Sequence, residues 1–305
     1  MIYTITLNPS IDYVVQVNQL NLGELNKMEN AMMFPGGKGI NVSRVLHELV
    51  YDTTALGLLG GFTGDFITDT LNNYGIRTNF TPIKGDTRIN IKLKSGIETE
   101  INGQGPEILP HEASELLYQL EDITNQDTVV LSGSTPPSLT NDLQRQMLER
   151  IVEAGAGFVI DTTGAALKSA LPYRPLLVKP NKDELAELFG VTLSNQEDVI
   201  NYGKQLLDLG AKNAIVSMAG DGALLFTEED IYHGQAPKGH VRNSVGAGDS
   251  MIAGFAGKYT ETADVMEAFR MSLAAGSATA FADDLAMAGD VFSLREKIDI
   301  THISK

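Results

Sequence analysis

Three small residues precede a lone carboxylate near the C-terminal end of the chain, in the stretch NSVGAGDSMIAGF at 243–255. An apolar helical pattern begins here, and a helix start offers unpaired N–H groups and the positive end of the helix dipole, which bind anions such as phosphate. Gly246, Ala247 and Gly248 leave those amides open to a ligand. Asp249 would repel the same anion, so it fits a base that takes the proton of a hydroxyl attacking a phosphate. The alternative is a loop followed by a helix cap at Asp249.

The composition excludes several other kinds of site. The chain has 305 residues, 43% of them hydrophobic, and no cysteine, which rules out disulfides, thiolate zinc sites and cysteine nucleophiles. Its five histidines are scattered without metal-ligand spacing. A formal net charge of −16 argues against nucleic acid or a membrane surface as a partner, because both attract basic proteins. The N-terminal stretch lacks a signal-peptide pattern, and no apolar run reaches the ~18 residues of a membrane span, so we expect a cytoplasmic protein.

Short apolar runs alternate with helical stretches through the middle and end of the chain. They cover residues 128–132, 158–161, 176–179 and 214–217. Unbroken apolar runs of this length predict an α/β fold, with a central, mostly parallel sheet covered by helices on both faces. Such sheets bind ligands at the carboxyl ends of their strands, and the polar stretches SGS, DTTG, KPNKDE and SMAGDG follow these four runs. Because no linker or repeat interrupts the pattern, we expect a single domain over 1–305.

Two segments break this rhythm. Residues 13–33 and 88–103 alternate polar and apolar side chains, and Ser95-Gly96 forms a tight-turn signal within the second. Alternation is typical of strands with one solvated face. We predict a small β-sheet that projects from the main domain as a lid over the site or as a dimer surface. An edge hairpin without a function is the alternative.

The usual phosphate-binding motifs are missing, since no stretch spells GxxxxGK[ST] or GxGxxG, and there is no GxSxG elbow of a hydrolase. The glycine-containing stretches that are present, in their order and spacing, resemble the ribokinase-like superfamily over essentially the whole chain, and within it the PfkB sugar kinases. PGGKGINVSR at 35–44 matches the first signature of that family. NSVGAGDSMIAGF matches the second, with Asn243-Ser244 where many members have Asp-Thr, and Asn181 and Glu184 match the NxxE element.

The resemblance implies ATP and Mg²⁺ as cofactors. Asp249 would be the catalytic base, and the amides of Gly246, Ala247 and Gly248 would stabilise the charge on the transferred phosphoryl group. Asn181 and Glu184 would organise Mg²⁺, with Glu184 reaching the metal through water. Residues implied to line the nucleotide pocket are Ser217, Gly220, Gly222 and Ser244. The alternatives are a helix cap with a solvated glutamate for the NxxE pair, and a plain β-turn for SMAGDG.

The resemblance also implies a sugar-binding side. Asp12, just after the first strand, would accept hydrogen bonds from sugar hydroxyls, with help from Asn41. Gly37 and Ser134 complete the predicted substrate-binding residues together with Lys38 and Arg88. Two cations in an acidic protein suggest an acceptor that already carries a phosphate, held at the end of the site opposite Asp249. The alternative is that both are solvated surface charges.

Several longer stretches, among them GDTRINIKLK at 85–94 and VSMAGDGALLF at 216–226, resemble the PfkB subgroup that uses fructose 1-phosphate. The implied reaction is ATP-dependent phosphorylation of fructose 1-phosphate to fructose 1,6-bisphosphate. Tagatose-6-phosphate kinase is the nearest alternative, and a non-catalytic sugar-phosphate sensor is an alternative of another class. We also expect a homodimer formed through the lid, because exposed strand edges invite pairing.

Overall fold

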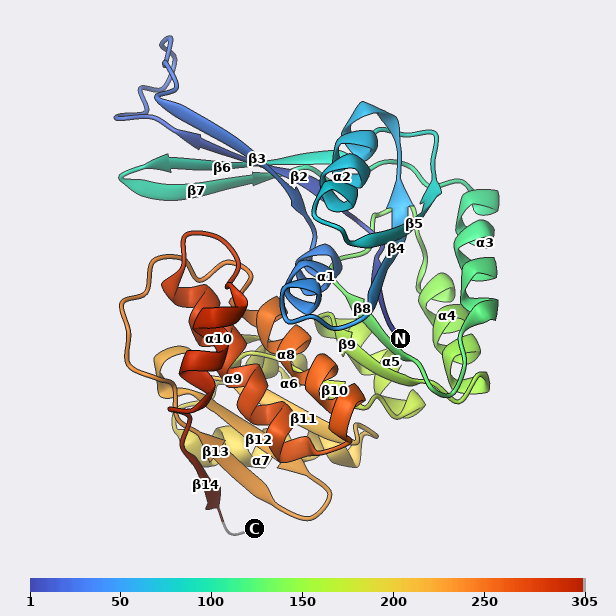
Figure 1. The fold of residues 1–305 in the computed structure, drawn as a ribbon, viewed down its shortest axis with the longest axis vertical. Coiled ribbons are helices and arrows are strands. Elements are labelled where there is room, and N and C mark those ends of the chain that lie inside the picture. The colour runs from blue at the N-terminus through green and yellow to red at the C-terminus, as the bar shows by residue number, and fades with distance from the viewer. Residues whose placement is uncertain (304–305) are drawn as a thin grey trace.

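The computed structural model describes residues 1–303 and contains two sheets of different size (Figure 1). The ten-stranded sheet has the order β14-β13-β12-β11-β10-β9-β8-β1-β4-β5. Its strands are β1 (Ile2–Thr6), β4 (Thr53–Leu59), β5 (Arg77–Pro82), β8 (Thr128–Ser132), β9 (Gly157–Asp161), β10 (Leu177–Val178), β11 (Asn213–Ser217), β12 (Ala223–Thr227), β13 (Ile231–Gly234) and β14 (Ile300–Ile303). All neighbours from β5 to β11 are parallel, and β12 to β14 add an antiparallel edge. The predicted mostly parallel sheet is confirmed.

Helices cover both faces of this sheet, because successive side chains of a strand point to opposite sides. In β8, Val129 and Leu131 enter one hydrophobic core while Val130 enters the other. The first core includes side chains of α3 (Pro110–Gln119), α4 (Asn141–Glu153), α5 (Gly164–Ala170), α6 (Lys182–Phe189) and α7 (Gln196–Asp208). The second includes side chains of α1 (Lys38–Glu48), α8 (Ala247–Thr262), α9 (Val265–Phe281) and α10 (Ala288–Arg295). Among residues 1–303, no helix has the length and apolar character needed to cross a bilayer.

The smaller sheet projects from the body at the upper left of Figure 1 and is called the lid below. Its four strands, in the order β3-β2-β6-β7, are β2 (Ser10–Gln16), β3 (Asn30–Gly36), β6 (Arg88–Ser95) and β7 (Ile97–Asn102). The predicted hairpin at 88–103 is confirmed, with Gly96 at its turn in a left-handed conformation. The predicted segment 13–33 is too narrow, since the strands extend to Ser10 and Gly36. These outer residues are buried where the lid joins the body, so they do not show the alternating pattern of the exposed part. Helix α2 (Gly61–Asn73) packs where the lid joins the body.

Candidate active site

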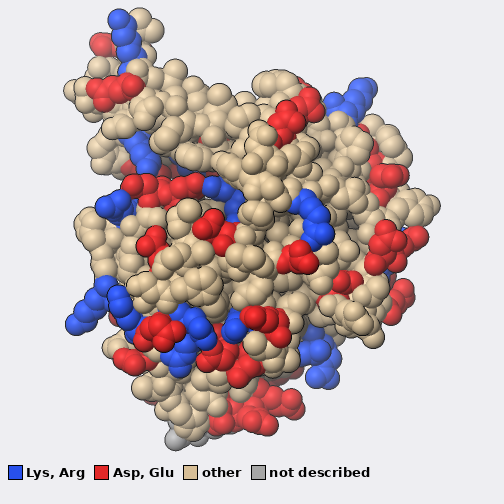
Figure 2. Space-filling view, in the orientation of Figure 1, with Lys and Arg blue, Asp and Glu red and all other residues tan. Residues whose placement is uncertain are grey.

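A cavity of about 1590 Å³ lies between the lid and the carboxyl ends of the parallel strands. The hollow beneath the lid is visible in Figure 2, with acidic and basic residues on its walls. All residues that the sequence singled out for catalysis and binding line this one cavity. They are Asp12, Gly37, Lys38, Asn41, Arg88, Ser134, Asn181, Glu184, Ser217, Gly220, Gly222, Ser244, Gly246, Ala247, Gly248 and Asp249.

Asp249 lies in the first turn of α8, which begins at Ala247 as the sequence predicts. Gly246 precedes the helix with a φ of 78°, a left-handed conformation that glycine adopts without strain, so the chain turns sharply into the helix. The Asp249 side chain does not cap the helix. It is only 6% exposed and accepts a hydrogen bond at Oδ2 from Asn41 Nδ2 at 2.8 Å. The geometry therefore favours a base that Asn41 orients over a helix cap.

The surroundings of Asp249 also change its acidity. Burial raises the pKa of the Asp249 carboxyl to about 6, and the nearby charge of Asp161 adds to this effect. The Asn41 hydrogen bond and the charges of Lys38 and Lys179 lower the pKa in part. A carboxylate with this pKa is largely ionised at neutral pH and accepts a proton more readily than an ordinary aspartate.

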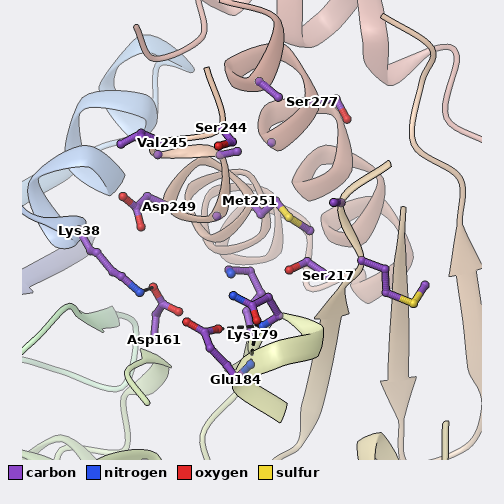
Figure 3. Close-up of a pocket in the computed structure, with 18 of the residues that line it drawn as sticks. Lys38, Asp161, Lys179, Glu184, Ser217, Ser244, Val245, Asp249, Met251 and Ser277 are labelled. Atoms are coloured by element: carbon purple, nitrogen blue, oxygen red, sulfur yellow. Dashed lines mark hydrogen bonds and ion pairs between the residues drawn. The ribbon is translucent and has the colours of Figure 1, made fainter. Parts of the chain in front are cut away.

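Asp161, at the end of β9, pairs with Lys38 beside Asp249 (Figure 3). Its Oδ2 lies 3.2 Å from Lys38 Nζ and accepts a hydrogen bond from Ser132 Oγ at 3.1 Å. Burial alone would raise the pKa of Asp161, but the charges of Lys179 and Lys38 hold it below its usual value. Asp161 is thus a buried carboxylate that keeps its charge, because the two lysines compensate it.

Lys179 follows β10 and is also buried, at 6% exposed. A Cβ atom at Gly248 would lie 3.0 Å from Lys179 Nζ, so a larger residue there would crowd the ammonium group. The amides at the start of α8 and the cations of Lys179 and Lys38 therefore gather at the same part of the cavity. This part can stabilise a concentrated negative charge such as a phosphoryl group in transfer.

Lys38 and Arg88 do not lie together as the sequence suggested. Lys38 begins α1 and points to Asp161, near Asp249, because the start of α1 faces the end of β9. Arg88 lies at the base of the lid, where Nε and Nη2 donate to the carbonyl of Asn8 and Nη1 donates to the carbonyl of Gly103. The expectation that both cations occupy the end opposite Asp249 is therefore wrong for Lys38.

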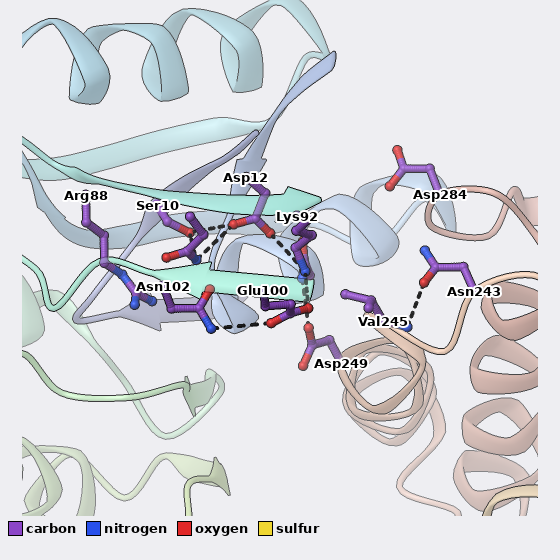
Figure 4. Close-up of polar contacts among 12 residues, drawn as sticks. Ser10, Asp12, Arg88, Lys92, Glu100, Asn102, Asn243, Val245, Asp249 and Asp284 are labelled. Atoms are coloured by element: carbon purple, nitrogen blue, oxygen red, sulfur yellow. Dashed lines mark hydrogen bonds and ion pairs between the residues drawn. The ribbon is translucent and has the colours of Figure 1, made fainter. Parts of the chain in front are cut away.

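Asp12 follows the first strand, as predicted, and lies within β2, in the lid (Figure 4). Its Oδ1 accepts hydrogen bonds from Ser10 Oγ at 2.9 Å and from Asn90 Nδ2 at 3.1 Å. Its Oδ2 lies 3.8 Å from the ammonium of Lys92, a residue of β6. The carboxylate is thus held in one orientation on the cavity-facing side of the lid.

Asn181 and Glu184 form a reciprocal capping box at the start of α6. Asn181 Oδ1 accepts from the Glu184 amide at 2.8 Å, and Glu184 Oε2 accepts from the Asn181 amide at 2.8 Å. Within the described residues, Glu184 Oε1 has no such partner, and no cluster of three or more histidines, cysteines or carboxylates could by itself hold a metal. One free carboxylate oxygen fits Mg²⁺ that is bound mainly by water and substrate phosphates, which is the usual arrangement for this ion.

The remaining predicted residues lie around the nucleotide side of the cavity. Ser217 ends β11, and Gly220 and Gly222 lie in the connection to the antiparallel strand β12, so the β-turn alternative and the cavity-lining role both apply. Ser244 lies in the loop before α8. Asn243 Oδ1 in that loop accepts a hydrogen bond from the Val245 amide at 3.0 Å, which fixes the approach to the helix.

Among the cavity residues that were not predicted individually, the charged residues Asp161, Lys179, Lys92 and Glu100 matter most for the argument. A charged residue at the end of a buried apolar run was the available signal for Asp161 and Lys179, because burial of an unpaired charge is costly. For Lys92 and Glu100 the signal was the hairpin register around Gly96, which pairs these two positions directly.

Comparison with known proteins identifies the family of this chain. The profile described as pfkB family carbohydrate kinase matches residues 5–284. The chain is 46% identical over 303 residues to a 1-phosphofructokinase of Bacillus subtilis (strain 168), covering 99% of this chain and 100% of that protein. It is 38% identical over 307 residues to a D-tagatose-1-phosphate kinase of Bacillus licheniformis, covering 99% of this chain and 100% of that protein. The structure of a candidate phosphofructokinase from Staphylococcus aureus superimposes with a TM-score of 0.89 at 44% identity, covering 100% of this chain and 99% of that one. The chain therefore belongs to the pfkB family of carbohydrate kinases and is a sugar kinase, as its motifs predicted.

Proposed function

We propose that this kinase transfers the γ-phosphoryl group of ATP to fructose 1-phosphate and forms fructose 1,6-bisphosphate. The observation that carries the proposal is the position of Asp249, a buried carboxylate with a raised pKa directly at the amides of the α8 N-terminus. A base next to an anion site fits the attack of a hydroxyl on a phosphoryl group. The cavity of about 1590 Å³ exceeds the ~300–1,000 Å³ of a pocket for one small ligand, so it has room for two substrates side by side.

In the proposed reaction, Asp249 takes the proton of the acceptor hydroxyl as its oxygen bonds to the γ-phosphorus. The bond from that phosphorus to the oxygen of ADP breaks, and ADP leaves with the electron pair. The amides of Gly246, Ala247 and Gly248, together with Lys38 and Lys179, compensate the negative charge on the transferred group. Asn41 keeps the Asp249 carboxylate in position. Mg²⁺, when bound near Glu184, would supply further neutralisation of the ATP phosphates.

We infer the identity of the acceptor from the names of the relatives and from the residues of the lid. The 46% identical relative is named for fructose 1-phosphate chemistry, and Arg88 lines the cavity at the base of the lid. The 38% identical relative makes tagatose 1-phosphate a second candidate. Tagatose 6-phosphate, the alternative that the sequence suggested, remains a further candidate. Both 1-phosphates carry a phosphate at one end and a free terminal hydroxyl at the other.

A coupled ADP-release assay tests the proposal. ATP is offered with fructose 1-phosphate, tagatose 1-phosphate, fructose 6-phosphate, tagatose 6-phosphate or free fructose, and kcat/KM is compared. We expect the highest value for fructose 1-phosphate. A higher value for another acceptor would replace the named substrate, and phosphosugar binding without ADP release would support the sensor alternative instead.

We further propose that two copies associate through the lid. Its strand register places one set of side chains toward the cavity and leaves the other set on the opposite face. That opposite face is apolar and exposed at Met33, Ile89, Ile97 and Ile101. Sedimentation at micromolar concentration should show a dimer, and Ile97→Glu with Ile101→Glu should shift the protein to a monomer. A wild type that sediments as an active monomer would contradict this arrangement.

A further inference from the structure

The lid carries an ionic network on the side that faces the cavity. Lys92 Nζ lies 3.2 Å from Glu100 Oε1 and 3.8 Å from Asp12 Oδ2 (Figure 4). One ammonium group on β6 therefore pairs with two carboxylates, one on each of the flanking strands β2 and β7. Asn102 Nδ2 donates to Glu100 Oε2 at 3.3 Å and completes the network on β7. All of these residues line the cavity.

The register of the strands explains why these side chains meet. Lys92 pairs directly with Glu100 across the β6–β7 hairpin, and Asp12 is paired with Asn90, two residues before Lys92. The three charged residues therefore share one face of the lid. The side chains of Lys92 and Asp12 are only 12% and 17% exposed. Water therefore screens their charges less than it screens surface charges, and the interaction between them is stronger.

On the cavity-facing side of the lid, the positive and negative charges balance only when Lys92 is present. Asp12 and Glu100 are carboxylates, and among the described residues that line the cavity, Arg88 is the other cation that a lid strand contributes. Burial alone would raise the pKa of Glu100, but the hydrogen bond and charge of Lys92, with a hydrogen bond from Asn102, hold it below its usual value. Glu100 therefore stays charged at neutral pH. Without Lys92 the wall would carry an excess negative charge and would repel an anionic acceptor.

We propose that Lys92 is a specificity-determining residue, whose charge neutralises Asp12 and Glu100 so that the lid accepts a sugar that already carries a phosphate. The inference rests on the proposed function in that it requires a phosphorylated acceptor. Lys92 of the lid thereby takes a role toward the acceptor phosphate that the sequence analysis had given to Lys38 and Arg88. It also differs from direct contact between Lys92 and the acceptor phosphate, because here Lys92 acts through its two carboxylate partners.

The test compares the KM for the phosphosugar among variants of the full chain. We expect Lys92→Met to raise this KM roughly tenfold or more, with the KM for ATP unchanged, because an unscreened carboxylate pair then faces the acceptor phosphate. Lys92→Arg keeps the charge and should stay close to wild type. Lys94→Met is the matched control, since Lys94 is exposed, lies two residues further on the same face and does not line the cavity.

The decisive variant is Lys92→Met combined with Glu100→Gln. Removal of one carboxylate restores the balance, so the KM should return to within about threefold of wild type if neutralisation is the role of Lys92. A double variant as weak as Lys92→Met would overturn the inference in favour of direct phosphate contact. A wild-type KM in Lys92→Met, or an equal loss in Lys94→Met, would overturn it as well. If thermal melting shows that Lys92→Met is unfolded, Lys92→Gln, which is uncharged but polar, replaces it in both comparisons.

The wild-type substrate screen separates this inference from the proposed function. If the wild type prefers tagatose 1-phosphate, the named substrate is wrong, and the Lys92 series run with that sugar still decides the inference. A wild type that prefers free fructose to every phosphosugar overturns both.

Discussion

The two walls of the active-site cavity differ in how they are built. The core wall holds Asp249 and Asp161, which are 6% and 4% exposed and lie at the ends of elements packed inside the body. The lid wall includes β7, in which every residue is exposed. Electrostatic stabilisation of a transition state needs fixed groups in a water-poor setting, whereas acceptor entry needs a surface that can open. From this difference we propose that the core wall performs the chemistry and that the lid wall selects the acceptor.

The largest expected effect lies in the core wall. Asp249→Asn keeps the shape of the side chain but removes the base, so turnover should fall by at least ~10²-fold while ATP still binds. Asp264→Asn is a matched control, because Asp264 caps α9 through the amides of Met266 and Glu267 and asparagine caps equally well. Steady-state kinetics and ATP titration measure both. Wild-type turnover in Asp249→Asn would show that catalysis does not depend on this carboxylate of the core wall.

Substitution of Arg88, a cation of the lid, should instead affect how well the enzyme uses the acceptor. Arg88→Met should weaken kcat/KM for the phosphosugar by about 2–3 kcal/mol, the scale of a lost charge-assisted hydrogen bond, with the KM for ATP little changed. Arg88→Lys keeps the charge but loses the planar fork that reaches Asn8 and Gly103, so it should recover only part of the loss. Loss of ATP affinity in Arg88→Met would show that the lid wall does not act on the acceptor alone.

The pH dependence of kcat/KM sharpens the role of the core wall. A base with a pKa of about 6 must be ionised to act, so activity should rise with pH and level off above that value. The charge of Asp161 contributes to the raised pKa of Asp249, and removing this charge lets Asp249 ionise more easily. In Asp161→Asn the rise of kcat/KM on the acid side of the pH profile should therefore occur at lower pH. A rise at the same or a higher pH would contradict the coupling of these two carboxyls.

The smallest effect is expected at the nucleotide side. Glu184→Gln retains the capping box, because the glutamine oxygen can still accept from the Asn181 amide, but it removes the charge offered to Mg²⁺. The Mg²⁺ concentration for half-maximal activity should rise several-fold with no change in melting temperature. Asp198→Asn, in the similar capping box of α7, is the control, because Asp198 itself does not line the cavity. An unchanged Mg²⁺ requirement in Glu184→Gln would exclude its carboxylate from the metal site.

The sequence predicted the buried strands better than the edges of the fold. Residues 128–132 and 158–161 coincide with β8 and β9, because an unbroken apolar run is a strong signal for a strand covered on both faces. The antiparallel edge from β12 to β14 was not predicted, since its pairing depends on turns and on a return of the chain from residue 234 to residue 300. The ends of the lid strands were missed because Ser10 and Gly36 are buried at the junction with the body.

The sequence also identified which residues share the cavity but not how they pair. Motifs at the carboxyl ends of parallel strands necessarily meet at one edge of the sheet. Their partners depend on packing between distant segments, since Lys38 and Asp161 are 123 positions apart and Asn41 and Asp249 are 208 apart. Lys38 was therefore placed with Arg88 on the basis of charge alone, although the start of α1 directs it to the core wall.

The kinetics of Lys38→Met test the division between the two walls most directly, because Lys38 follows the lid hairpin β2–β3 in sequence but belongs to the core wall in space. Both kcat and KM for the phosphosugar are measured at saturating ATP. We predict that kcat falls roughly tenfold or more through loss of a charge that stabilises the transferred phosphoryl group, while the KM for the phosphosugar stays within about twofold of wild type. An increase in that KM with an unchanged kcat would place Lys38 on the acceptor and contradict the division.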